Sequence, residues 1–109
     1  MAWLLRDGEV LATIEVAAST RARLRGLAGR DHLEGGLLLE HVRSVHSICM
    51  RFPIDVAFLD SEMTVLSTVT LVPFRAALPR PAARSVLEAE AGAFDRWGLR
   101  RGDRLEVRP

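Results

Sequence analysis

The side chains best suited to chemistry lie close together in one apolar run, residues 45–60, which contains His46, Cys49, Met50 and Asp55. A histidine beside a carboxylate could act as a general base and its orienting group, and a cysteine beside a histidine could form a nucleophile–base pair. Asp55 stands out, because a carboxylate in an apolar strand must be solvated, paired or put to use. Acid–base, nucleophilic and metal chemistry therefore have to be weighed for this run.

Asp55 has a structural and a functional interpretation. Strand alternation over residues 54–59 places Ile54, Val56 and Phe58 on one apolar face, which leaves Asp55 on the other. A buried carboxylate without a partner is costly, so we expect hydrogen bonds to backbone amides of the 51–53 turn, or an arginine partner. The alternative is a site carboxylate that partial burial prepares for function.

The cysteine and the histidines give weaker predictions. If residues 45–50 form a strand, His46 and Cys49 point to opposite faces, and only a bulge would reunite them as a nucleophile–base pair. Cys49 is then expected to be a small buried apolar residue. His41, His46 and Cys49 also offer one ligand fewer than the four of a structural zinc site. We therefore predict no metal and no cofactor.

Length and composition indicate one soluble domain, residues 1–109. Apolar residues make up 49% of the chain and charged residues 27%, which is ordinary for a globular protein. One cysteine excludes an intrachain disulfide and favours a reducing compartment. The apolar stretch at the start is too short for a signal peptide or a membrane helix. We therefore expect a cytoplasmic protein without a membrane segment.

Arginine is the basic residue throughout, since lysine does not occur in the sequence. This excludes Schiff-base lysines, phosphate-loop lysines and Ser–Lys pairs. Two basic groups are expected, Arg21, Arg23, Arg25 with Arg30, and Arg100, Arg101 with Arg104. The net charge is only +1 and no aromatic residue accompanies these groups, so we predict no nucleic-acid partner. Binding of an anion or an acidic partner stays open.

The elements that must position these residues are mostly short strands. Asp7-Gly8 predicts a hairpin of strands 3–6 and 10–16. Further strands are expected at 37–39, 45–50, 54–59, 65–72, 85–89 and 104–108, with a surface loop at 73–83. One short helix should run from Ser19 or Thr20 to Ala28 and stop at Gly29, and a second should contain Phe94 and Trp97. The predicted fold class is mainly β (α+β), a compact antiparallel β sandwich or barrel with two short helices.

Several short motifs, in order, resemble a known family. Residues 23–30 carry an R-x-R-G-L-x-G-R pattern, residues 36–39 read G-L-L-L, and residues 50–60 read M-R-F-P-I-D-V-A-F-L-D. Residues 83–88 followed by Gly92, and the later Gly-Leu and Gly-Asp pairs, complete the series. The chain thereby resembles the prokaryotic domain of unknown function 192 family over about residues 10–108. The resemblance implies a compact, mainly antiparallel β fold with short helices, but no mechanism, because the family's activity is not established.

The sequence thus predicts a non-catalytic binding module with a pocket near the Met50–Asp55 turn. The expected ligand-binding residues are Arg25, Arg30, His46, Met50 and Asp55. The partner would be a small ligand or a protein, with Met50 as an adaptable apolar wall. One alternative is a small hydrolase or isomerase that uses His46 and Asp55 as catalytic residues. Another is an assembly or scaffold subunit, which would need an exposed apolar patch.

Overall fold

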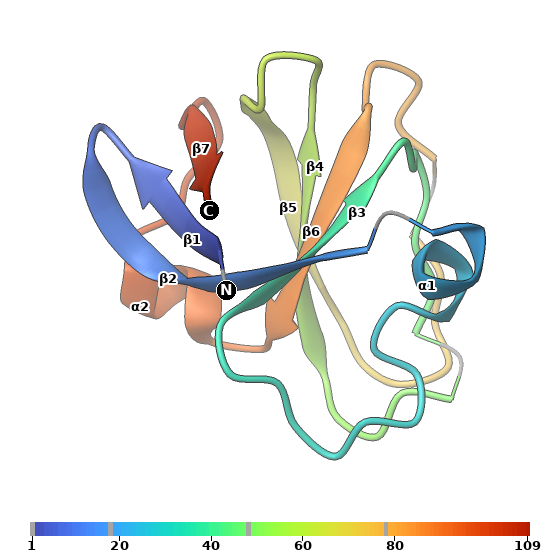
Figure 1. The fold of residues 1–109 in the computed structure, drawn as a ribbon. Helices are drawn as coiled ribbons and strands as arrows, with labels where there is room; N and C mark the ends of the chain where they lie inside the picture. Colours follow the sequence, from blue (N-terminus) through green and yellow to red (C-terminus); the bar gives the residue numbers. More distant parts are fainter. Residues whose placement is uncertain (1, 18, 48, 78) are drawn as a thin grey trace.

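The computed structural model describes residues 2–17, 19–47, 49–77 and 79–109. These residues form a seven-stranded sheet, in the order β5-β4-β6-β3-β2-β1-β7, and two short helices (Figure 1). The strands are β1 (Ala2–Arg6), β2 (Glu9–Ala17), β3 (Gly36–Glu40), β4 (Ile54–Leu59), β5 (Val65–Leu71), β6 (Ser85–Glu90) and β7 (Leu105–Arg108). The helices are α1 (Thr20–Arg25) and α2 (Ala93–Trp97). The predicted mainly β fold with two short helices is confirmed.

The sheet is mixed and curled. β2 and β3 are parallel, whereas every other neighbouring pair of strands is antiparallel. A parallel pair needs a crossover connection, which α1 and residues 26–35 provide. The two edge strands approach each other at one end, where Thr64 and Arg104 form an isolated bridge. The expected antiparallel sandwich or barrel therefore takes the form of one curled sheet with a single parallel pair.

The start of the chain follows the sequence prediction, but the first helix is shorter than predicted. β1 pairs with β2 through the Asp7-Gly8 turn, in which both residues have positive φ. The Ser19 hydroxyl caps α1 by accepting a hydrogen bond from the Ala22 N–H at 3.1 Å. The helix ends at Arg25 and not at Ala28, because Gly26 adopts φ 52° and ψ −129°, a conformation that excludes continuation of a helix.

Residues 45–50 were predicted as a strand, and this prediction is wrong for the described part. His46 forms an isolated bridge with Ala76, and Ser47 is fully buried. The Ser47 Oγ donates to the Val72 carbonyl at 2.5 Å and accepts from the Arg75 N–H at 2.8 Å. The hydroxyl thus binds this segment to the proline-rich loop, and a strand partner is not needed.

The environment of Cys49 also differs from the prediction. Its side chain is exposed and its φ is 63°, whereas a buried apolar residue on an extended strand was expected. The Met50 N–H donates to the Ser47 carbonyl at 3.1 Å, so the chain turns here. Alternation therefore does not describe how His46 and Cys49 are placed. Ile48, also assigned to that strand, lies outside the described residues.

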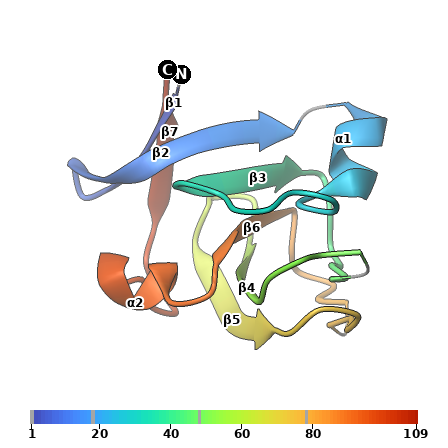
Figure 2. The same ribbon diagram turned by 90° about the horizontal axis from the view of Figure 1, so that it is seen from below.

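The two faces of the sheet carry separate apolar clusters. One cluster is covered by α1 and the long loops, and its sheet residues include Leu37, Leu39, Val56, Phe58 and Val86. The other is enclosed by the curl and by α2, and includes Leu4, Leu38, Ala57, Leu87 and Phe94. Figure 2 shows α1 beyond the ends of β2 and β3, and α2 at the opposite end of the molecule. α1 therefore covers one face of the sheet, and α2 covers the other.

Asp55 lies on the α2 face. Its Oδ2 accepts hydrogen bonds from the N–H groups of Gly92 and Phe94 at 2.9 and 3.2 Å, and its Oδ1 accepts from the Thr70 hydroxyl at 2.8 Å. The backbone partners belong to the start of α2, not to the expected 51–53 turn. Asp55 thus fastens α2 to β4 and β5.

We predict that Asp55→Ala lowers the free energy of unfolding by about 1–3 kcal/mol, because two backbone N–H groups and one hydroxyl lose their acceptor. Urea denaturation monitored by circular dichroism measures the change. Glu62→Ala, at an exposed turn, serves as the control and should stay within about 0.5 kcal/mol of the parent. Equal stability of the Asp55 variant and the parent would contradict the anchoring role.

Candidate functional site

The most unusual group of the structure is the carboxyl of Glu88, on the α1 face of β6. Glu88 pairs with Leu37 and Val56 on the neighbouring strands, so its side chain enters the apolar cluster beneath α1. It is 1% exposed, and its Oε1 has no hydrogen-bond partner among the described residues. A buried polar atom without a partner is rare and costly in native proteins. Glu88 is therefore the strongest candidate for a functional side chain.

Burial sets the protonation of this group. Desolvation raises the pKa of Glu88 from 4.5 to about 7, while a hydrogen bond from the Leu27 N–H and the charge of Arg30 act in the opposite direction. The carboxyl group therefore changes charge near neutral pH. Groups with this property can donate a proton or a hydrogen bond under physiological conditions.

An open cleft of about 260 Å³ leads to Glu88, between α1 and residues 41–46. Leu39, Val45 and Met50 are among its apolar walls. Its ionisable lining residues are Arg23, Arg25, His41, His46 and Glu88. The cleft thus combines an apolar wall, cationic side chains that come from α1, and a carboxyl group that can be protonated near neutral pH.

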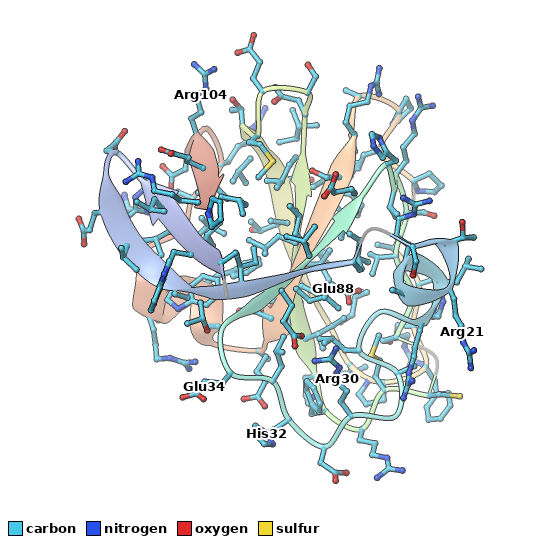
Figure 3. All side chains as sticks on the ribbon, viewed as in Figure 1. Arg21, Arg30, His32, Glu34, Glu88 and Arg104 are labelled. Atoms are coloured by element: carbon cyan, nitrogen blue, oxygen red, sulfur yellow. The ribbon has the colours of Figure 1, made fainter. Side chains whose placement is uncertain are left out.

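A second hollow of about 470 Å³ lies on the other side of α1, against β2. Arg25 and Gly26 line both hollows, so this stretch of backbone separates them. Arg30 lines the second hollow and forms an ion pair with Glu15 at 2.6 Å. Figure 3 shows Glu88 near the centre of the molecule, with Arg30 on the side towards His32 and Glu34.

Gly26 explains how α1 can lie so close to Glu88. A Cβ atom at this position would lie 2.9 Å from Glu88 Oε1, and the positive φ of Gly26 disfavours any side chain. Glycine therefore permits the close approach of backbone to carboxyl group. The end of α1 and the burial of Glu88 depend on the same residue.

The structure brings together most of the predicted ligand-binding residues. Arg25, His46 and Met50 line the cleft, and Arg30 borders the neighbouring hollow. Asp55 lies on the opposite face of the sheet, against α2. His46 and Asp55, paired in the hydrolase or isomerase alternative, therefore do not share a site.

Sequence reasoning missed Glu88, although a signal was present. The S-V-L-E-A-E segment of β6 carries Glu88 between the apolar residues Leu87 and Ala89, as β4 carries Asp55 between Ile54 and Val56. Alternation places Glu88 beside Val86, which belongs to the apolar cluster. The test applied to Asp55 would have identified Glu88 as well.

Two further properties concern the described part of the chain. No three His, Cys, Asp or Glu side chains in this part gather as a metal site would require. None of its helices is long and apolar enough to cross a lipid bilayer.

Known proteins resemble this chain in sequence. The family described as "Uncharacterized ACR", the domain of unknown function 192, matches residues 2–107. An uncharacterised UPF0127 protein of Pyrococcus abyssi is 40% identical over 63 residues, and one of Pyrococcus furiosus is 38% identical over 63 residues. Each match covers 58% of this chain and 54% of the relative, so the alignment spans about half the length of these curated relatives.

Two crystal structures have a similar fold. A protein of unknown function from Novosphingobium aromaticivorans has a TM-score of 0.80 at 22% identity, over 96% of this chain and 82% of that one. A candidate transcription regulator from Sinorhizobium meliloti has a TM-score of 0.82 at 25% identity, over 97% and 91% of the two chains. These likenesses support the same arrangement of strands and helices.

The pKa of Glu88 predicts how stability depends on pH. Between pH 4.5 and 7 the unfolded chain releases the Glu88 proton while the folded protein retains it, so raising the pH removes stability. The loss is complete above pH 7 and amounts to at most about 3 kcal/mol, at about 1.4 kcal/mol per pKa unit. The glutamine of Glu88→Gln cannot ionise, so the variant does not undergo this loss. The free energy of unfolding of the variant, relative to that of the parent, should therefore rise by that amount between pH 4.5 and 8. Urea denaturation across this range measures it, and parallel pH curves would contradict the raised pKa.

The contact between Gly26 and Glu88 predicts a coupling. Gly26→Ala should destabilise the parent more than the Glu88→Ala variant, because the added methyl group meets the carboxyl group only in the parent. A double-mutant cycle should give a coupling of about 0.5–3 kcal/mol. Gly102→Ala is the control, since its φ is also positive but no atom lies within 4 Å of the added Cβ. Equal costs in both backgrounds would show that Glu88 does not limit position 26.

Proposed function

The chain belongs to the domain of unknown function 192 family, and we propose that it is a non-catalytic module that binds a small molecule in the cleft between α1 and residues 41–46. Arg25, His46 and Met50 would contact the ligand, and Glu88 would meet it at the inner end. Arg30 would contribute its charge from the neighbouring hollow. Asp55 would support the fold from the other face of the sheet.

The observation that carries this proposal is the buried, unpartnered Oε1 of Glu88, a residue that lines a cleft open to solvent. An apolar side chain of similar volume would pack here without the cost of desolvating a carboxyl group. A ligand that hydrogen-bonds to Oε1 would offset that cost. Apolar walls with a few convergent polar groups are also the usual composition of small-molecule sites.

Binding is favoured over catalysis by the placement of the polar groups. A hydrolase or isomerase that used His46 and Asp55 would need both side chains at one substrate, and the sheet lies between them. Glu88 could itself transfer a proton, but none of the described cleft residues forms a nucleophile–base pair with it. The assembly alternative draws support from exposed apolar side chains such as Leu24 and Phe74, which are 72% and 65% exposed.

We predict that small molecules bind in this cleft and that a bulky side chain in its wall prevents this. A fragment collection titrated into ¹⁵N-labelled protein should shift the amide signals of residues 23–27, 41–46 and 88 together. Ser44→Trp, an exposed position in the cleft lining, should abolish these shifts while the rest of the spectrum is retained.

Glu62→Trp is the control, because it adds the same bulk at an exposed turn outside the cleft lining and should leave the shifts unchanged. Fragment shifts that persist in the Ser44 variant would place binding elsewhere. A collection that shifts no cleft signal would contradict the binding function altogether.

A further inference from the structure

We propose that the ligand is a small organic monocarboxylate, whose carboxylate accepts a hydrogen bond from protonated Glu88 and lies beside Arg25. This inference rests on the proposed binding function and names the chemical class of its ligand.

The charges around Glu88 favour an anion over a cation. α1 contributes Arg23 and Arg25, and the loop after it contributes Arg30, whose charge is paired with Glu15 of β2. Residues 41–46 contribute His41 and His46 from the opposite wall. Glu88 is the only acidic residue among the described residues that line the cleft. A cationic ligand would meet the like charges of Arg23 and Arg25, whereas a carboxylate would be attracted and can pair with a guanidinium group.

The carboxyl group of Glu88 can donate a hydrogen bond to an anion only when it is protonated. In that form it carries an O–H donor at the inner end of the cleft, which Glu88 lines and where its buried Oε1 has no partner among the described residues. A carboxylic acid kept neutral by an apolar environment is a good hydrogen-bond donor to an oxyanion. The ionised form would repel the same ligand. Burial raises the pKa of Glu88 to about 7, so the neutral form is available at physiological pH.

The size and the walls of the cleft define the rest of the ligand. A volume of about 260 Å³ is slightly below the range of typical small-molecule sites, so the ligand has few carbon atoms. Leu39, Val45 and Met50 offer an apolar surface, and the flexible thioether of Met50 can adapt to different shapes. A short aliphatic or aromatic body attached to one carboxylate satisfies both conditions.

Three probes of one length test the proposal: hexanoate, hexanamide and hexylammonium. Each is titrated into ¹⁵N-labelled protein between pH 6 and 8.5, and the cleft amide signals are followed. Hexanoate should bind most tightly at pH 6, and its affinity should fall about tenfold per pH unit above 7, because one proton is taken up on binding. Hexanamide should bind more weakly than hexanoate at pH 6, and without this pH dependence.

Variants identify the groups responsible. Glu88→Gln keeps a hydrogen-bond donor but cannot ionise, so hexanoate should bind at pH 8.5 about as well as at pH 6. Glu34→Gln, which alters an exposed carboxylate, should keep the parent's pH dependence. Arg25→Gln should weaken hexanoate about tenfold or more and hexanamide little. Arg104→Gln, at an exposed position outside the cleft lining (Figure 3), should change neither.

The outcomes separate this inference from the proposed function. Equal, pH-independent binding of hexanoate and hexanamide would overturn the carboxylate inference and leave a binding module. Preferred binding of hexylammonium that strengthens with pH would overturn it in favour of a cation. A pH dependence of hexanoate binding that survives in Glu88→Gln would also overturn it. If no probe shifts the cleft signals, the inference and the cleft-binding function both fail.

Discussion

The close approach between the end of α1 and β6 determines how this face of the molecule is built. Gly26 lies directly over the Glu88 carboxyl group, and no residue with a side chain fits there without displacing that group. The same glycine ends α1, which turns the chain towards Leu27 and the apolar cluster. The approach removes Glu88 from water and raises its pKa to about 7. Helix length, burial and charge are thus linked through one backbone position.

Asp55 and Glu88 are both buried in the sheet, but the cost of burying their carboxyl groups is compensated in only one of them. Asp55 receives three hydrogen bonds from α2 and β5, so its burial is compensated within the fold. Glu88 has one oxygen without a partner, and its remaining hydrogen bond comes from the Leu27 N–H. The first group strengthens the structure at the end of the sheet that α2 covers. The second costs stability, and its residue lines an open cleft.

The curl of the sheet separates these two roles in space. Residues that alternate along β4 and β6 enter different apolar clusters, one beneath α2 and one beneath α1. The cleft that Glu88 lines lies on the α1 side, where the long loops pack against the sheet instead of a further strand. The Ser47 hydroxyl fastens two of these loops to each other. The wall that carries His46 and Met50 therefore depends on loop packing.

Local patterns in the sequence determined most of the strands, the first hairpin, the N-terminal cap of α1 and the face on which Asp55 lies. These features follow from interactions between near neighbours, such as turn geometry and alternation, which a sequence displays directly. Arg25, His46 and Met50 were also recognised as ligand-binding candidates. The parallel β2–β3 pair, the irregular segment at 45–50 and the partners of Asp55 were decided only in the tertiary structure. Each depends on residues that are distant in the sequence, as does the position of Glu88 beneath Gly26. Alternation along β6 indicates only that Glu88 shares a face with apolar residues, whereas the approach of Gly26 to its carboxyl group arises in the folded chain.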